Sequence, residues 1–205
     1  MILLALQVLV IFASPVLAES DEDLAKKLAN PVASLISVPL QYNYDENFGA
    51  DHDGTKNLLN VQPVIPISLG DEYNLISRTI LPLVDEDGAP TGTSKTGLGD
   101  VVQSFFFSPK KPTSAGLIWG VGPALLLPTA SEKVLGGEKW GAGPTFVGLK
   151  QKGPLTYGLL ANHLWSYAGE GNRQDVNATF IQPFLSYITA TKTTFTLNTE
   201  STYDW

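Results

Sequence analysis

The stretch Phe195-Thr196-Leu197-Asn198-Thr199-Glu200-Ser201-Thr202-Tyr203 decides the fold, because apolar and polar side chains alternate along it. Successive side chains of a β-strand point to opposite faces, so a period of two predicts a strand with one apolar and one polar face. The stretch is about ten residues long, which is the length that a tilted strand needs to cross a lipid bilayer. The apolar face of such a strand meets either lipid or a protein core.

The same alternation recurs along the chain from about residue 35 onward. Prolines lie inside several of the segments, where each removes one donor of the hydrogen-bond ladder, so we expect bulges or strand ends at these positions. We expect nine strands, at 35–44, 58–69, 73–84, 99–108, 117–128, 140–150, 155–167, 177–188 and 193–205. The prolines concerned are Pro39, Pro63, Pro66, Pro82, Pro123, Pro144 and Pro183.

The connections between these strands alternate in length. Long polar loops are expected at 45–57, 85–98, 129–139 and 168–176, and short turns at 70–72, 109–116, 151–154 and 189–192. Long loops at one end and short turns at the other are typical of outer-membrane barrels. The predicted fold is therefore all-β, an antiparallel up-and-down transmembrane β-barrel over 35–205. Because bacterial single-chain barrels have an even number of strands, we expect a C-terminally truncated barrel of about twelve.

Aromatic residues fall near the expected strand ends or on apolar faces. Indole and phenol rings favour the membrane interface, where one side of the ring is apolar and the other is wet. An ordinary aromatic core is the alternative reading of the same residues. They are Tyr42, Tyr44, Tyr73, Trp119, Trp140, Tyr157, Trp165, Tyr167, Tyr187, Tyr203 and Trp205.

The N-terminus predicts export. Residues 1–18 form an apolar run that ends in Val16-Leu17-Ala18, as in a secretory signal peptide cleaved after Ala18. An uncleaved anchor is the alternative. Residues 19–34 are expected to be a lead-in, in which residues 20–29 form either a short helix or a disordered terminus. The chain has no cysteine, and its net charge of −7 argues against nucleic acid as a partner.

Five segments resemble a family of Gram-negative outer-membrane proteins labelled "MetA-pathway of phenol degradation", some members of which carry the label neuromedin U. They are LANPVASLISVPLQYNY (28–44), LNVQPVIPISL (59–69), NLISRTILPL (74–83), GLGDVVQSFFFSPKKP (97–112) and GLIWGVGPALLLPTA (116–130). The resemblance covers about residues 25–205 and implies an outer-membrane β-barrel with a channel role. It carries no catalytic motif, and the phenol label is weak evidence for a substrate.

Polar side chains within the expected strands are candidates to line the barrel lumen. A charged side chain within a spanning strand should point inward, because an Arg exposed to lipid at the midplane costs about 2–4 kcal/mol. Such inward charges either pair with one another and plug the pore or line an open path. The lumen-lining candidates are Arg78, Asp100, Glu200, Gln62, Asn74, Asn162, Gln182 and Asn198, with Gln41, Asn43 and Asn60 beside them.

Residues suited to catalysis or metal binding are few. His52 lies among Asp45, Glu46, Asp51 and Asp53, but the spacing does not match a calcium loop, so a solvated charged loop is the favoured reading. His163 lies beside Trp165 and is more readily structural than catalytic. No nucleophile elbow, zinc motif or phosphate loop occurs. We therefore predict no enzyme activity, no cofactor and no metal.

Three functions are consistent with the sequence. The first is an outer-membrane channel or transporter for small solutes, apolar or aromatic ones among them, with outer-membrane lipid and lipopolysaccharide as partners. The second is a barrel enzyme that acts on membrane lipid, which would need a Ser, His and acid group near one rim. The third is a secreted soluble β-protein that binds a lipid-like ligand, whose apolar faces would point inward.

Overall fold

The computed structural model describes residues 4–11, 20–48, 54–88, 93–191 and 193–205. One antiparallel sheet contains thirteen strand segments, in the spatial order β1-β2-β3-β5-β7-β8-β9-β10-β11-β12, with β4, β6 and β13 beside this path. The strands are β1 (Leu4–Ile11), β2 (Ser37–Phe48), β3 (Gly54–Val61), β4 (Val64–Leu69), β5 (Tyr73–Asp87), β6 (Ser94–Leu98), β7 (Val101–Pro109), β8 (Leu117–Leu127), β9 (Lys139–Lys152), β10 (Leu155–Gly169), β11 (Asn177–Ile188), β12 (Thr194–Asn198) and β13 (Ser201–Asp204). The helices are α1 (Asp21–Leu28) and the 3₁₀ turn η1 (Lys133–Leu135).

The nine predicted strands are confirmed as extended segments. Two of them, 58–69 and 193–205, are broken in two, and a third break separates β6 from β7. The backbone N–H of Gln62, at the β3–β4 break, donates to the Pro39 carbonyl (2.9 Å). The other two breaks lie opposite prolines in the same way, since Gly99 N donates to Pro82 O (2.8 Å) and Thr199 N to Pro183 O (3.2 Å). Proline supplies no ladder donor, which accounts for the irregular partner strand at each position.

Two predicted long loops, 45–57 and 85–98, are wrong in extent, because strands continue far into both. Strand β2 runs to Phe48, β3 begins at Gly54, β5 runs to Asp87 and β6 begins at Ser94. Lys56 lies opposite both Asp45 and Glu86 in the register, and its ammonium lies 3.6 Å from the Glu86 carboxylate. Opposite charges facing each other across strands stabilise a ladder, so these polar segments pair as extended hairpins.

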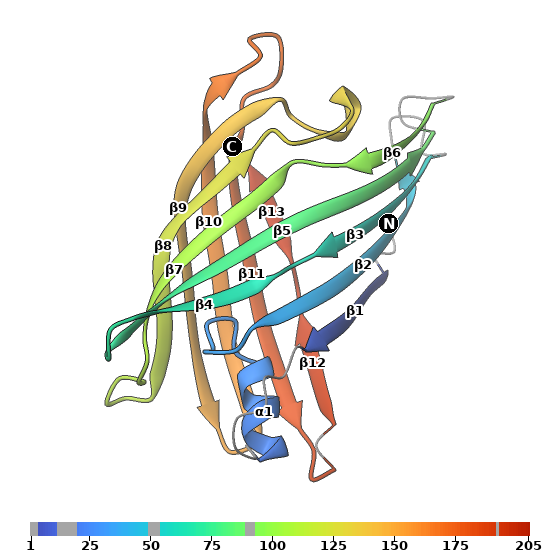
Figure 1. Cartoon of the computed structure of the whole chain (residues 1–205). Helices are drawn as coiled ribbons and strands as arrows, with labels where there is room; N and C mark the ends of the chain where they lie inside the picture. Colours follow the sequence, from blue (N-terminus) through green and yellow to red (C-terminus); the bar gives the residue numbers. More distant parts are fainter. Residues whose placement is uncertain (1–3, 12–19, 49–53, 89–92, 192) are drawn as a thin grey trace.

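The connections are sorted between the two ends of the sheet, as predicted (Figure 1). The turns after β4, β7, β9 and β11 lie at one end together with α1, and we call this the short-turn end. The connection that contains η1, the β10–β11 connection and the β2–β3 and β5–β6 hairpin ends lie at the other, the long-loop end. Gly70 (φ 67°) and Gly153 (φ 57°) supply the left-handed backbone that two of the short turns need.

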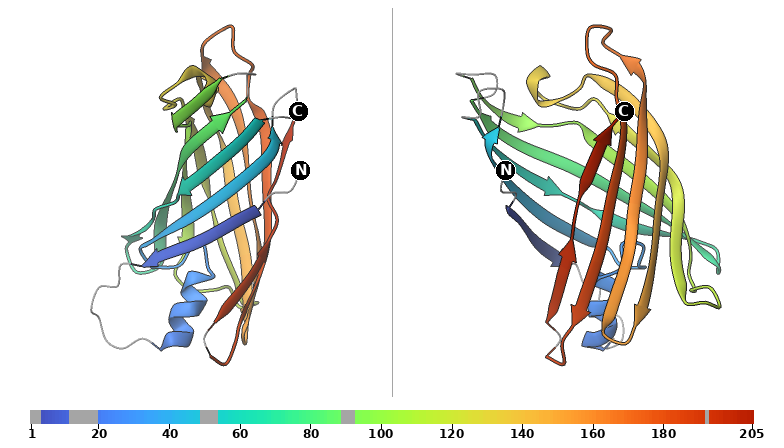
Figure 2. Two further views of the ribbon diagram at one scale, coloured as in Figure 1. Left: turned by 90° about the vertical axis from the view of Figure 1, so that its right-hand side faces the viewer. Right: turned by 180° about the vertical axis from the view of Figure 1, so that it is seen from behind.

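The sheet coils until its two edges approach each other (Figure 2). Gln41 of β2 donates a side-chain hydrogen bond to Glu200, which lies between β12 and β13 (3.2 Å to Oε1). Among the described residues no backbone ladder joins β1 or β2 to β12 or β13, so side chains make this contact. The coil gives the sheet an inner and an outer face.

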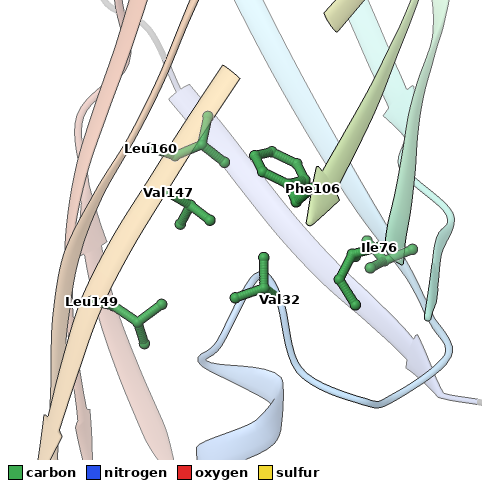
Figure 3. Packing of buried hydrophobic residues seen from close by; sticks show 7 residues of the cluster. Val32, Ile76, Phe106, Val147, Leu149 and Leu160 are labelled. Atoms are coloured by element: carbon green, nitrogen blue, oxygen red, sulfur yellow. The ribbon is translucent and has the colours of Figure 1, made fainter. Parts of the chain in front are cut away.

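The inner face holds the apolar core. Ile76 of β5 and Phe106 of β7 are 0% exposed, and they form one cluster with Val147, Leu149 and Leu160 (Figure 3). A Cβ atom on Gly120 would lie 3.1 Å from the Phe106 Cβ, so the small residue in β8 leaves room for that ring.

The alternation predicted one apolar face for each strand, and in the structure this face is the outer, exposed one. Strand β11 illustrates this, because Ile181, Leu185 and Tyr187 are exposed while Ser186 and Ile188 between and beside them are buried. Large exposed apolar side chains on the described strands are Tyr42, Ile65, Ile67, Leu69, Tyr73, Leu83, Phe107, Val121, Trp140, Phe146, Leu155, Tyr157, Leu159, Trp165, Tyr167, Ile181, Leu185, Tyr187, Phe195, Leu197 and Tyr203.

The exposed aromatic residues form two groups, one toward each end of the strands. Tyr157 and Tyr187 lie near the short-turn end, where Tyr187 faces Phe195 in the register and Tyr73 contacts Phe107. Trp140, Trp165, Tyr167, Tyr203 and Trp205 lie toward the long-loop end, close to the β10–β11 connection. Between them the outer face carries side chains such as Val121 and Phe146, which are directly opposite each other.

The N-terminal lead-in closes part of the inner space. Helix α1 is confirmed, with the Ser20 hydroxyl accepting from the Asp23 N–H (3.2 Å), and the chain after it enters the coil. There Val32 is 5% exposed within the core cluster, and the Asn74 amide donates to the Ser34 hydroxyl (2.6 Å). We call residues 20–35 the N-terminal segment.

Strand β1 lies within the predicted signal peptide and pairs antiparallel with β2. The expected cleavage point after Ala18 lies outside the described residues, and cleavage stays a prediction. Removal of 1–18 would leave β2 as the first strand of the sheet.

Candidate functional site

A chain of polar side chains crosses the inner space from β5 to β11. The Arg78 guanidinium donates to Gln62 Oε1 (2.6 Å), and the Gln62 amide donates to Gln41 Oε1 (2.9 Å). The Gln41 amide in turn donates to Glu200 Oε1 (3.2 Å), which also accepts from the Gln182 amide (2.8 Å). We call these five residues the interior network. Four of them, all but Gln41, are among the main lumen-lining predictions, and here they are brought together.

Gln41 is the centre of the interior network. It is 4% exposed, and its amide also lies 3.2 Å from Asn43 Oδ1. Its position on the polar face of β2 follows from the alternation, because Leu40 and Tyr42 flank it on the other face. Gln41 thus bonds directly to Glu200 near the other end of the sheet order and is linked to Arg78 of β5 through Gln62.

Beside the interior network lies a cavity of about 200 Å³, toward the short-turn end. Arg78, Gln62, Gln41, Gln182 and Asn198 line one part of it, and the N-terminal segment from Lys27 to Leu35 lines another. Apolar side chains complete the wall: Val64, Leu160 and Phe184. The role of the N-terminal segment as a wall was not predicted, and no periodicity in 19–34 indicates it.

The other lumen-lining predictions lie elsewhere. Asn74 is buried but bonds to Ser34, and Asn162 is half-buried on the inner side of β10, opposite Thr145. Asp100 takes no part in the interior network, because its carboxylate accepts from Ala130 N (3.2 Å) and Gly137 N (2.6 Å). It anchors the β8–β9 connection at the long-loop end.

A second charged group holds the connections at the long-loop end. The Lys139 ammonium lies 2.8 Å from the Asp175 carboxylate, to which the Ser166 hydroxyl also donates (3.2 Å). The hydrogen bond from Lys139, its charge and the Ser166 bond hold the pKa of the Asp175 carboxyl below its usual range. The stabilisation from this lowered pKa is present at neutral pH and is lost as the pH falls through it.

Of the two histidines, only His163 lies within the described residues. His163 lies on the outer side of β10, where its Nδ1 is 2.7 Å from the Thr179 hydroxyl and its ring packs on Trp165 at 4.1 Å. His52, Asp51 and Asp53 lie outside the described residues. Within the described ranges no group of His, Cys, Asp and Glu side chains is arranged to hold a metal ion.

Comparison of the chain with family models, with curated proteins and with solved structures finds no match. In the described ranges, no helix combines the length and the apolar character that crossing a membrane requires.

Replacing Gln41 by leucine is expected to lower the free energy of unfolding by about 2 kcal/mol, because it leaves the Gln62 amide without its acceptor and Glu200 without one donor. Equilibrium unfolding in urea, followed by tryptophan fluorescence of the refolded protein in phospholipid, measures this. The neighbouring Tyr42→Phe is the matched control, since it removes one exposed hydrogen bond to Asn57 and should cost less than about 0.5 kcal/mol. Equal effects of the two changes would contradict a structural role for the interior network.

Proposed function

We propose that the chain forms a β-barrel in the outer membrane of a Gram-negative bacterium and acts as a channel or transporter for small solutes, apolar or aromatic ones among them. The observation that carries the proposal is the distribution of side chains between the two faces of the sheet. Gln41, Gln62, Asn74 and Thr145 are buried on the inner face, while Phe107 is 49% and Trp165 50% exposed on the outer face. A soluble β-protein would bury such rings, because removing apolar surface from water lowers the free energy by about 25 cal/mol per Å².

Two further observations support the membrane part of the proposal. The long connections lie at one end and the short turns at the other, as in bacterial barrels, whose short turns face the periplasm. Two groups of Tyr and Trp residues flank an apolar band that includes Val121 and Phe146, which is the arrangement of interfacial girdles. On this orientation α1 and the N-terminal segment lie at the periplasmic mouth.

The inner space favours a selective, normally closed path over a wide pore. The core cluster of Ile76, Phe106 and Leu160 fills the inner space together with Val32 of the N-terminal segment. What remains beside the interior network is a cavity of about 200 Å³, the size of one small solute. A membrane-lipid hydrolase has less support, because His163, the one histidine in the described ranges, lies on the outer face with a threonine hydroxyl as its partner.

The test is the behaviour of the full chain after refolding in detergent. We expect partition into the detergent phase and faster gel migration of the unboiled sample than of the boiled one. In planar bilayers we expect low conductance with brief openings. A protein that stays in the aqueous phase, with one mobility before and after boiling, would contradict the proposal.

A further inference from the structure

Two cationic side chains line the cavity beside the interior network, although the chain as a whole is acidic with a net charge of −7. Lys27 and Arg78 both line it, and among the described residues no Asp or Glu does. Glu200 lies behind this wall, where it accepts from Gln41 and Gln182. The charge that faces the cavity is therefore cationic.

Arg78 retains donors for a ligand. Its guanidinium carries five N–H groups, and its hydrogen bond among the described residues is the one to Gln62 Oε1. No ion pair joins it to a described carboxylate, although the charge of Glu200 acts on it through space, and its side chain lines the cavity. Burying a cation without a direct anionic partner is costly, and an anion in the cavity would offset that cost.

The other side chains that line the cavity determine which non-polar part of a ligand fits. Val64, Leu160 and Phe184 from three strands and Leu35 from the N-terminal segment present apolar surface to the cavity. A cavity of about 150 Å³ lined by apolar side chains accommodates a benzene ring. The 200 Å³ here therefore suit one ring or a short aliphatic chain together with a small charged group.

We infer that this cavity binds a small organic monocarboxylate, with the carboxylate on Arg78 and the apolar body against Leu160 and Phe184. Guanidinium and carboxylate match in a planar, two-bond geometry, which a bulkier or uncharged head group does not reproduce. The inference rests on the proposed function, of which it names the solute class.

The experiment is calorimetric titration of the full chain, folded in detergent at neutral pH, with benzoate, with benzamide and with sulfate. Benzamide has the shape of benzoate without the charge, and sulfate has charge without an apolar body. We expect benzoate to bind roughly tenfold or more tightly than either, the change that a charge-assisted hydrogen bond provides. Arg78→Gln should weaken benzoate binding roughly tenfold and leave benzamide binding unchanged.

Two variants separate this site from general charge effects. Lys95→Gln removes the same charge from an exposed side chain at the long-loop end and should leave benzoate binding unchanged. Gln62→Glu places a carboxylate beside Arg78, while retaining the arginine, and should weaken benzoate binding as Arg78→Gln does. Mobility of unboiled samples on gels verifies that each variant is folded.

The experiment distinguishes a failure of the carboxylate site from a failure of the proposed membrane function. A folded, detergent-partitioning protein that gives no benzoate binding, or binds benzamide or sulfate equally well, would overturn the inference and leave the proposed function standing. Equal weakening by Lys95→Gln and Arg78→Gln would also overturn it. Benzoate binding by a protein that is soluble without detergent would support the carboxylate site and overturn the membrane proposal.

Discussion

Replacing Val121 by arginine is expected to destabilise the folded protein in a phospholipid bilayer by about 2–4 kcal/mol, the cost of an arginine on the lipid face near the midplane of a barrel. Val121 lies in the middle of β8, opposite Phe146, and is 42% exposed on the outer face. Exposed sites on a soluble protein usually tolerate such a change within about 0.5 kcal/mol. Urea unfolding of the protein in phospholipid vesicles measures the difference.

Val134→Arg is the matched control, because it makes the same substitution at a valine that is 38% exposed in η1 at the long-loop end. In the proposed orientation this side chain meets water, and the change should cost less than about 0.5 kcal/mol. Small and equal effects at both valines would mean that water covers the outer face as well.

Replacing Val32 by aspartate is expected to displace the N-terminal segment and raise the conductance of the protein in planar bilayers. The Val32 side chain is buried against the core cluster, and a carboxylate there would be desolvated without a partner. The segment should also become accessible to protease added to the short-turn side. Val134→Asp, which adds the same charge on an exposed connection, should leave the conductance unchanged.

A disulfide tests whether movement of the N-terminal segment causes the raised conductance expected of Val32→Asp. Ser34 and Asn74 are joined by a side-chain hydrogen bond of 2.6 Å, and the chain has no cysteine of its own. With Ser34→Cys and Asn74→Cys added to Val32→Asp, the oxidised protein should keep the low conductance and a reductant should release it. High conductance in both redox states, with the disulfide formed, would show that the segment does not control the path.

Much of the architecture follows from the period of two in the sequence. It predicts the strands and the face on which each side chain lies, since both are local properties, and the alternating lengths of the connections predict their sorting between the ends. The same pattern places Gln62, Arg78, Gln182 and Glu200 on the inner face. It does not predict that they form one network, because that depends on how far the sheet coils and on which residues meet across its edges.

The predictions that were wrong, for the two acidic loops and for Asp100, also have physical explanations. The acidic stretches at 45–57 and 85–98 resemble loops in composition, but cross-strand charge pairs such as Lys56 with Glu86 hold them as strands. Asp100 has the pattern of a lumen residue, yet the break between β6 and β7 turns its carboxylate to the backbone of a connection. In both cases the deciding interaction is between distant segments.

The proposed function depends most on which medium covers the outer face, and quenching of tryptophan fluorescence by brominated lipid tests this directly. The four native tryptophans are replaced by phenylalanine, and one tryptophan is introduced by Phe146→Trp on the outer face or by Val134→Trp on the connection. In vesicles of lipid brominated along its acyl chains, we expect strong quenching of the fluorescence at 146 and little at 134. Equal, weak quenching at both positions would contradict the account.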